Sequence, residues 1–491
     1  MKTKLSKLIL GYDIMFPYCE VPNGLNPKYL KFAEHCDWIF DKSQSYFQNE
    51  FNLNWPLFNG RFMVHLDDES GNPGYFAIDK KSVYDIIKDR ERGKGNYDWY
   101  YLIEPYGHID NFLGISQEYK DDEFYRFIPK KTLEEIINGN GKLIINYAID
   151  GGFDTNNLQK LKNILINLNL PKEKIIIIHN DVHLKEMVER IFGDYAPKLI
   201  HYCWSLNSKS EEYYKRQTLG EYFFWKDENL RKNYDFQSNS ECVDLQNKTH
   251  KFLNLNRRLR KHRLEIINFL WKENILSDTL ISYDSKLIQE DSMHHFIKKY
   301  GIGDWNLFYN FLNETSPKIV DYDDLTNIWG YGFESKKIYN NSLISILSET
   351  NFYEETGYLS EKIWKPIAHG HPFILIGPYN SLKFLREEFG FKTFSPFIDE
   401  SYDEEKDPNL RMQKIEKEIK RLNNYTLEEL KQIVEKLKSV ILHNKKLLFK
   451  YGSKRLMALD YLHYLKITDK DDEANELLKT FILQNNSNKL I

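Results

Sequence analysis

Short apolar runs alternate with amphipathic segments in the first half of the chain, and this alternation restricts the possible folds more than any other feature. The runs have strand length, are rich in β-branched or aromatic residues, and cover residues 142–149 (KLIINYAI), 174–179 (KIIIIH) and 198–204 (KLIHYCW). Leucine and isoleucine recur at helical spacing in 156–168 and 181–192, where Asp181 is the predicted N-cap. Because strands joined by crossover helices pair in parallel, we predict an α/β fold with a parallel sheet, opened by a strand at 7–11.

The chain is too long for a single ordinary core, because it has 491 residues. The polar, irregular stretch 229–250 is the predicted linker, after which a second unit begins with a strand at 251–256, a basic loop and an amphipathic helix at 263–271. We therefore predict an N-terminal α/β domain (1–247), a C-terminal Rossmann-like domain (248–425) and a helical extension (426–491).

Later segments of the second half continue the pattern. We predict a strand at 343–347, a helix at 360–369 that Pro366 kinks or interrupts, and a strand at 372–376. A helix is predicted over 426–449, because its first residues, Thr-Leu-Glu-Glu, supply an N-cap and a capping-box glutamate.

Composition indicates a globular protein of the cytoplasm. Hydrophobic residues make up 41% and charged residues 29%, and the formal net charge of -4 gives no overall attraction to nucleic acid or anionic membrane. The 4 cysteines are widely spaced without a CxxC pattern, which favours reduced thiols. No apolar stretch reaches the ~18 residues of a membrane span, so we expect no transmembrane segment and no nucleic-acid partner.

A basic run follows the predicted strand 251–256. Between Lys248 and Arg263 there are seven Lys or Arg residues and no acidic residue. Arg257, Arg258 and Arg260 fall between a strand and a helix, where guanidinium groups and helix N-terminal amides can bind a diphosphate without a metal. The alternative is a solvated basic loop.

Glu361 and Lys362 begin the predicted helix 360–369. Glutamate suits the positive end of the helix dipole, but lysine does not, so Lys362 indicates an anion nearby. The alternative is an ordinary pair of surface charges in a first helical turn.

These residues lie in a stretch that resembles a known family. The run GYLSEKIWKPIAHGHPFILIGP (357–378) is similar to the donor-binding segment of the α1,3-fucosyltransferase family, including soluble viral and bacterial members, and the likeness extends over 343–407. The resemblance implies two Rossmann-like domains that face each other across a cleft (GT-B type). It further implies that Lys362 contacts the donor diphosphate, Glu361 the ribose or sugar hydroxyls, and that Tyr358 lines the nucleotide pocket.

Because of two departures from the family pattern, the identities of the nucleotide base and of the transferred sugar remain undetermined. Ser348-Glu349-Thr350 replaces Glu-Asn-Ser, and Pro366-Ile367 replaces Asn-Ala. The expected activity is transfer of a sugar from a nucleotide-diphosphate donor, with GDP-fucose favoured, to a glycan or other hydroxyl acceptor. We expect inversion at the sugar carbon and no metal or cofactor apart from the donor.

An inverting transferase also needs a base for the acceptor hydroxyl. The candidates are Asp150, which precedes a Gly-Gly turn, and Glu104 and His108, which follow an apolar run. For Asp150, plain turn chemistry is the alternative.

Three other kinds of protein remain open. A metal-dependent transferase would use Asp321 and Asp323, or Asp67 and Asp68, as ligands. A phosphate- or nucleic-acid-binding module would use the basic run, and a carbohydrate-binding protein without catalysis would use the many Tyr and Trp residues as stacking platforms.

Overall fold

The computed structural model divides the chain into two compact units, each described here by itself. Unit 1 comprises Met1–Asn207 and Met457–Ile491, and unit 2 comprises Ser208–Leu456. The structure describes residues 6–12, 76–94, 97–103, 130–147, 154–201, 245–256, 258–320, 336–395, 397–449 and 467–476.

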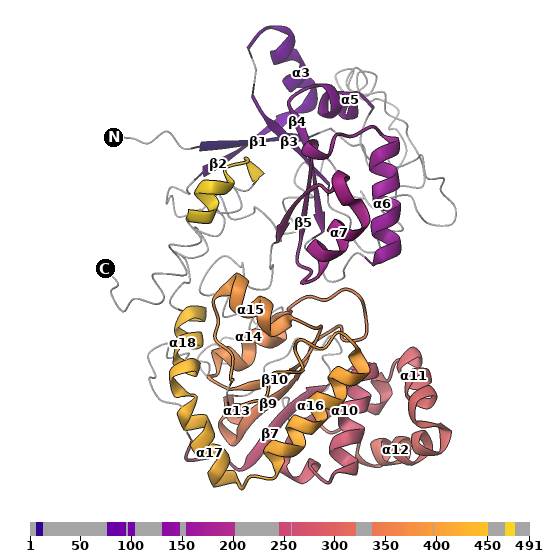
Figure 1. Ribbon diagram of the computed structural model, residues 1–491, viewed down its shortest axis with the longest axis vertical. Helices are drawn as coiled ribbons and strands as arrows, with labels where there is room; N and C mark the ends of the chain where they lie inside the picture. Colours follow the sequence, from indigo (N-terminus) through magenta and orange to yellow (C-terminus); the bar gives the residue numbers. More distant parts are fainter. Residues whose placement is uncertain are drawn as a thin grey trace, which may run out of the picture. The chain divides into compact units, whose positions relative to one another are not determined.

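Unit 1 contains a six-stranded parallel sheet, as the alternating pattern predicts (Figure 1). Its strands stand in the order β2-β1-β3-β4-β5-β6. Their bounds are β1 (Ser6–Tyr12), β2 (Phe76–Ser82), β3 (Trp99–Ile103), β4 (Gly141–Tyr147), β5 (Ile175–His179) and β6 (Lys198–His201). The strands predicted at 7–11, 142–149, 174–179 and 198–204 are therefore confirmed within a few residues at each end, except that 148–149 and 202–204 lie outside the described residues.

Four helices pack on one face of this sheet. They are α3 (Val83–Glu91), α5 (Lys130–Asn138), α6 (Thr155–Asn167) and α7 (Leu184–Phe192). Ile175 and Ile177 of β5 belong to the core that these helices cover, while Ile176 and Ile178 are buried on the opposite face. A strand buried on both faces reads as a continuous apolar run, which explains the sequence IIIIH.

Local hydrogen bonds fix the starts of the helices. Asp154 caps α6, because its Oδ1 accepts a hydrogen bond of 2.7 Å from the backbone N–H of Asn157. The predicted N-cap Asp181 is wrong: α7 begins at Leu184, and Asp181 Oδ1 instead accepts from the backbone N–H of His183 at 2.7 Å.

A segment near the C-terminus packs on unit 1. Asp469 accepts hydrogen bonds from Lys142 of β4 and Lys198 of β6, the latter at 3.0 Å, and Asp471 accepts from Lys198 at 2.8 Å. Residues 467–476 therefore hold two strands of unit 1 that come from much earlier in the chain.

Unit 2 contains a four-stranded parallel sheet in the order β10-β9-β7-β8. The bounds are β7 (His250–Asn256), β8 (Thr279–Tyr283), β9 (Ser342–Ser348) and β10 (Phe373–Ile376). The strands predicted at 251–256, 343–347 and 372–376 are confirmed.

The helices of unit 2 lie around this sheet. They are α10 (Lys261–Lys272), α11 (Glu290–Tyr300), α12 (Ile302–Thr315), α13 (Lys336–Asn341), α14 (Glu361–Ala368), α15 (Ser381–Phe389), α16 (Pro408–Asn423), α17 (Leu427–Lys436) and α18 (Lys438–Phe449). Helix α10 contacts α11 and α16, and α14 contacts α18. The loop before α10 is shorter than predicted, because the helix begins at Lys261 with Arg260 as its N-cap.

The C-terminal helices differ from their prediction in extent. The capping box at Thr426 and Glu429 is confirmed, but the predicted helix 426–449 is two helices, α17 and α18, separated at Leu437. Helix α14 is uninterrupted at Pro366 and ends two residues later. The sequence predicts one separate extension over residues 426–491. In the structure, residues 426–456 belong to unit 2 and residues 457–491 to unit 1.

Candidate functional site

The strand order of unit 2 reverses between β7 and β9, and this reversal marks the place where parallel sheets bind ligands. Strand β7 pairs with β8 on one side and β9 on the other, and the next strand in sequence, β10, lies beyond β9. Phe252 pairs with Ile344 and Leu253 with Ser345, so the same register places Asn256 level with Ser348. The loops that follow these two residues therefore meet at the ligand-binding edge.

The basic run after β7 lies at this edge, but its arginines have different roles. Arg258 is exposed, and Arg260 is half-buried with its Nη1 donating to Thr350 O at 2.8 Å. Arg263 is buried and donates to Arg258 O at 3.0 Å and to Glu349 O at 3.1 Å, so it joins the loop after β7 to the loop after β9. Arg257 lies outside the described residues.

Lys362 projects from the first turn of α14 to the same edge. Its Nζ donates to Thr350 Oγ1 at 3.2 Å and to Ser360 Oγ at 3.0 Å. Ser360 is the N-cap of α14, and it also donates from Oγ to Glu349 Oε2 at 2.6 Å. Two of the contacts of Lys362 are therefore neutral hydroxyls, which leave the positive charge of the ammonium uncompensated by them.

Glu349 is fully buried beneath this cluster, and sequence reasoning missed it. Its carboxylate accepts from the backbone N–H of Ser360 at 3.2 Å as well as from the Ser360 hydroxyl. The signals that could have found it are that Glu349 directly follows a predicted strand and that Ser360 begins a predicted helix.

A glycine allows the loop after β9 to approach β10. A Cβ placed on Gly357 would overlap the ring carbons of Pro378, at 2.5 Å from its Cβ, so no larger residue fits without movement. The neighbouring Tyr358 is buried, at 4% exposure. Glu361 is the first residue of α14, and its side chain lies outside the described parts of the chain.

His262 reports the positive potential of the site. It is buried, and its Nε2 donates to Glu349 O at 2.9 Å. Burial lowers the pKa of His262 well below its usual value, and the positive charges of Arg263, Arg260 and Lys362 lower this pKa further. The imidazole is therefore neutral at physiological pH, and three cationic side chains of the described edge act on it.

Two buried polar atoms at the ends of β7 and β9 have no hydrogen-bond partner in the described part of the chain. They are Asn256 Oδ1 and Ser348 Oγ. Asn256 uses its Nδ2 to donate to Asn254 Oδ1 at 2.6 Å, so only its acceptor is unused. Buried polar groups are usually satisfied, which makes these atoms suitable contacts for a polar ligand.

A carboxylate cluster holds the loop after β9 from behind. Glu265 of α10 is fully buried and accepts from Tyr353 of this loop at 2.6 Å, and from His295 at 2.6 Å and Lys299 at 2.8 Å on α11. Burial alone would raise the pKa of Glu265, but these hydrogen bonds outweigh it and hold the pKa below its usual value. The loop that presents Thr350 to the site is thus fastened to two helices.

Glu416 of α16 lies near the same cluster. Burial raises its pKa to about 7, Lys299 opposes the shift, and the charges of Glu265 and Glu273 add to it. This carboxyl group is therefore partly protonated at neutral pH.

The predicted catalytic residues Asp150, Glu104 and His108 lie outside the described residues, as do Asp67, Asp68, Asp321 and Asp323. The strand order of unit 1 reverses between β1 and β3, and Glu104 follows β3 directly in the sequence. In the parts of the chain that the structure describes, no three His, Cys, Asp or Glu side chains form a group able to hold a metal ion.

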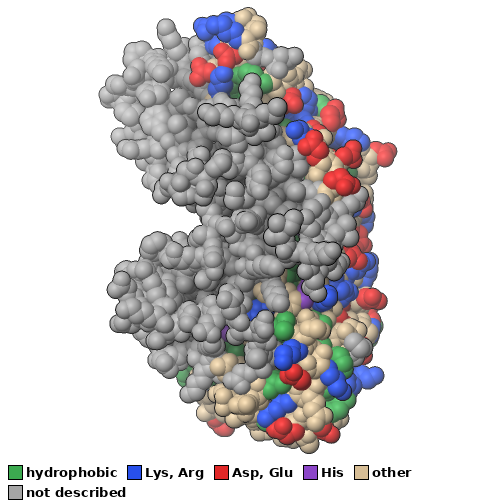
Figure 2. Space-filling view, turned by 90° about the vertical axis from the view of Figure 1, so that its left-hand side faces the viewer, with side chains coloured by type: hydrophobic (Ala, Val, Ile, Leu, Met, Phe, Trp, Pro, Cys, Tyr) green, Lys and Arg blue, Asp and Glu red, His purple; other side chains and the backbone are tan. Residues whose placement is uncertain are grey.

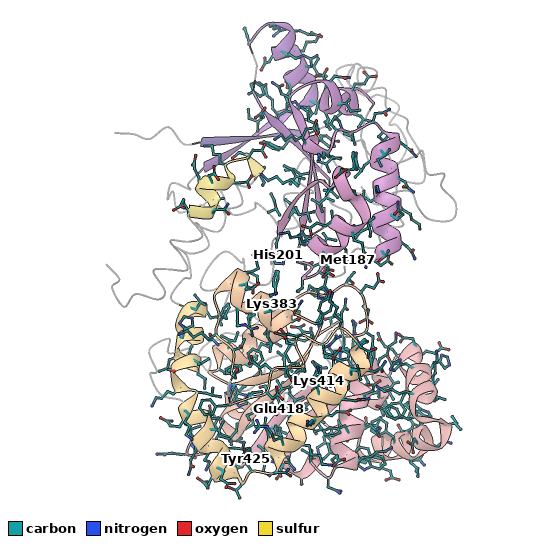
Figure 3. The ribbon with its side chains drawn as sticks, in the orientation of Figure 1. Met187, His201, Lys383, Lys414, Glu418 and Tyr425 are labelled. Atoms are coloured by element: carbon teal, nitrogen blue, oxygen red, sulfur yellow. The ribbon has the colours of Figure 1, made fainter. Side chains whose placement is uncertain are left out.

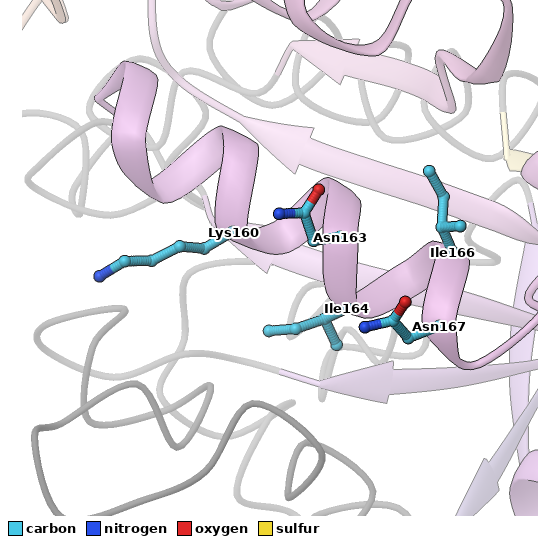
Figure 4. Close-up of a pocket in the computed structure, with 5 residues that line it drawn as sticks. All are labelled: Lys160, Asn163, Ile164, Ile166 and Asn167. Carbon is cyan, nitrogen blue, oxygen red and sulfur yellow. The ribbon is translucent and has the colours of Figure 1, made fainter.

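A pocket of about 280 Å³ lies elsewhere, on α6 of unit 1 (Figure 4). The residues that line it are Lys160, Asn163, Ile164, Ile166 and Asn167. They belong to the half of α6 that runs away from the carboxyl ends of the strands, and they include no acid or nucleophile. We therefore place the candidate site at the β7–β9 edge of unit 2 and not in this pocket.

The described surface has no dominant sign of charge on the face drawn in Figure 2, where Lys and Arg side chains mix with Asp and Glu. None of the described helices combines the length and apolar character required to cross a membrane. No family model matches the sequence, and a comparison with curated proteins finds no match.

Proposed function

We propose that this chain is a glycosyltransferase of GT-B type that takes a sugar from a nucleotide-diphosphate donor, with GDP-fucose favoured, and transfers it with inversion to a hydroxyl acceptor. The observation that carries the proposal is the position of Arg260 and Lys362 at the reversal between β7 and β9. The likeness of residues 343–407 to the α1,3-fucosyltransferases supports the same assignment.

The chemistry of glycosyl transfer explains why such cations matter. As the bond to the sugar breaks, negative charge accumulates on the leaving diphosphate, and positive groups held in place before the reaction stabilise that charge. Lys362 is held by Thr350 and Ser360, and Arg260 by Thr350 O, so neither cation has to be reoriented when the charge develops. A diphosphate can therefore be stabilised there without a metal.

The remaining groups of the edge suit the rest of such a donor. Asn256 and Ser348 lie level with each other on adjacent strands. Asn256 Oδ1 can accept a hydrogen bond from a hydroxyl group, and Ser348 Oγ can accept or donate one. Exposed Arg258 provides a further cation. The base that removes the acceptor proton would come from unit 1, for which Asp150, Glu104 and His108 are the candidates.

Ligand-induced thermal stabilisation by GDP, UDP and their sugars tests the donor. We expect a higher melting temperature with at least one of these nucleotides, because a ligand that binds only the folded state stabilises it. If none of them shifts the melting temperature, the transferase proposal is wrong. Binding to nucleic acid that falls steeply with salt, without a mononucleotide preference, would instead indicate a nucleic-acid-binding module.

The Lys362→Met variant tests the role of the cation while it keeps the aliphatic stem. Donor affinity and donor hydrolysis should fall about ten- to a hundredfold, because a hydrogen bond to a charged group contributes about 1.5–3 kcal/mol. The matched control is Lys272→Met, at the opposite end of α10, where an exposed lysine pairs with Asp304. Equal affinity and turnover in wild type and Lys362→Met would refute the assignment, and unchanged sugar binding in that variant would favour a non-catalytic carbohydrate-binding protein.

A further inference from the structure

Buried polar side chains gather at the carboxyl ends of β5 and β6 in unit 1. They are the buried residues His179, Asn180, Asp181 and His183, together with the half-buried His201, which we call the β5–β6 edge cluster. His179 and His201 pair across the two strands, and their rings stand edge to face with centroids 5.3 Å apart. Figure 3 labels His201 at the end of β6, with Met187 of α7 also labelled in this unit.

Asn180 is the unusual member of this cluster. Its side chain is 3% exposed, and neither its Oδ1 nor its Nδ2 has a hydrogen-bond partner in the described part of the chain. A buried primary amide is almost always hydrogen-bonded, because water no longer satisfies it. Asn180 does not belong to the apolar core on the helix-covered face of the sheet.

Asn180 lies at the carboxyl end of its strand, away from the reversal of unit 1 between β1 and β3. It directly follows the last residue of β5, and α7 begins four residues later at Leu184. Parallel sheets bind ligands beyond the carboxyl ends of their strands, at the same level as the N-termini of the following helices. The N-cap of α7, His183, makes no side-chain capping hydrogen bond to the helix.

The chemistry of the cluster selects the class of ligand. The amide offers one acceptor and two donors, which match a pair of neighbouring hydroxyl groups. Asp181 follows Asn180 directly in the chain, and the cluster has no Lys or Arg side chain to attract a phosphate or another anion. The imidazoles of His179 and His201 can contact hydroxyl groups as donors or acceptors.

We propose that the β5–β6 edge cluster binds a sugar or similar polyol through two hydroxyl groups that pair with the Asn180 amide. This inference rests on the proposed function only in one respect, namely that the bound polyol would be the acceptor of the transferred sugar. The Asn180 amide is 3% exposed, so the ligand reaches it only when residues 179–183 move apart from their neighbours. This requirement lowers the apparent affinity for the ligand.

The test combines binding and stability measurements on the full chain. Methyl glycosides of galactose, glucose and mannose at millimolar concentration serve as probes in saturation-transfer NMR, and hydrogen exchange follows residues 179–183. We expect at least one glycoside to bind and to slow exchange in this segment. The isosteric variant Asn180→Leu should lose tenfold or more in affinity for that glycoside.

Controls separate a binding role from a structural one. Asn180→Leu should melt at the same or a higher temperature than wild type, because it removes an unsatisfied buried amide. If it unfolds instead, the smaller Asn180→Ser variant should show the same loss of glycoside binding. The matched control, Asn138→Leu, changes an exposed amide at the end of α5 and should bind as wild type does.

The outcomes decide this inference and the proposed function separately. If no glycoside binds wild type, or if Asn180→Leu binds as tightly as wild type, the inference is wrong even when nucleotides still stabilise unit 2. If glycosides bind through Asn180 but no nucleotide shifts melting, the site stands and the transferase proposal fails.

Discussion

Replacing Glu416 with glutamine should stabilise unit 2 at alkaline pH and have little effect in acid. The pKa of Glu416 rises from 4.5 to about 7, chiefly through burial. A carboxyl group with a raised pKa in the folded state costs nothing below pH ~4.5, where it is protonated in both states. The cost grows as pH rises through this interval and is complete above ~7.

The structure sets the size of this effect. A shift of about 2.5 pKa units corresponds to about 3.4 kcal/mol, at about 1.36 kcal/mol per unit. Glu416 is partly exposed, so solvent screening reduces the cost, and we expect about 1–2 kcal/mol. Glutamine has nearly the same shape without the charge, so the variant should recover this amount at pH ~8 and almost none at pH ~4.

Equilibrium urea unfolding at both pH values measures the difference, with hydrogen exchange in α16 identifying the transition of unit 2. Glu404→Gln, a change at an exposed carboxylate, is the control for the loss of a surface charge. A Glu416→Gln variant that gains equally at both pH values, or that loses stability at the higher one, would contradict the assigned charge.

Three further substitutions test other contacts of unit 2. Gly357→Ala should cost about 1–3 kcal/mol in urea unfolding through overlap with Pro378, and a second change, Pro378→Ala, should restore part of it; additive losses would count against a steric cause. Glu265→Gln should reduce the free energy of unfolding by about 3 kcal/mol at neutral pH. Because the folded-state pKa of Glu265 is depressed, the stability of wild type should approach that of the variant as pH falls below ~4.5. A difference that stays constant with pH would exclude the carboxylate charge as the source of the stabilisation. Thr426→Ala should cost about 1 kcal/mol by loss of the capping box, whereas an unchanged midpoint would show that α17 does not need it.

Most strands of both sheets could be predicted because their signals are local, but β2 and β8 were not predicted. A strand such as β5 is a continuous apolar run between polar segments, and Thr426 and Glu429 form a capping box within one turn. The helix starts were harder, because Asp181 has the side chain of an N-cap but forms its hydrogen bond with His183 outside the helix. The break between α17 and α18 at Leu437 was also hard to predict, because no glycine or proline marks it in the sequence.

The candidate site could be predicted in part for the same physical reason. Arg260 and Lys362 were predicted because each lies next to a strand end or a helix start in the sequence. Glu349 was missed because its partner Ser360 is separated from it by a loop that the sequence does not show to be folded back. The close approach of Gly357 to Pro378 is likewise a contact between segments, so only the fold reveals it.

The division of the chain has a consequence for the order in which the protein forms during synthesis. Unit 2 is continuous in sequence, so all its residues have been synthesised once Leu456 has been made, whereas unit 1 needs Met457–Ile491 as well as its first 207 residues. Asp469, the hydrogen-bond partner of Lys142 and Lys198, is therefore synthesised only after the whole of unit 2. A chain that stops after residue 456 would therefore contain all of unit 2 but lack the last segment of unit 1, the unit whose first residues are made earliest.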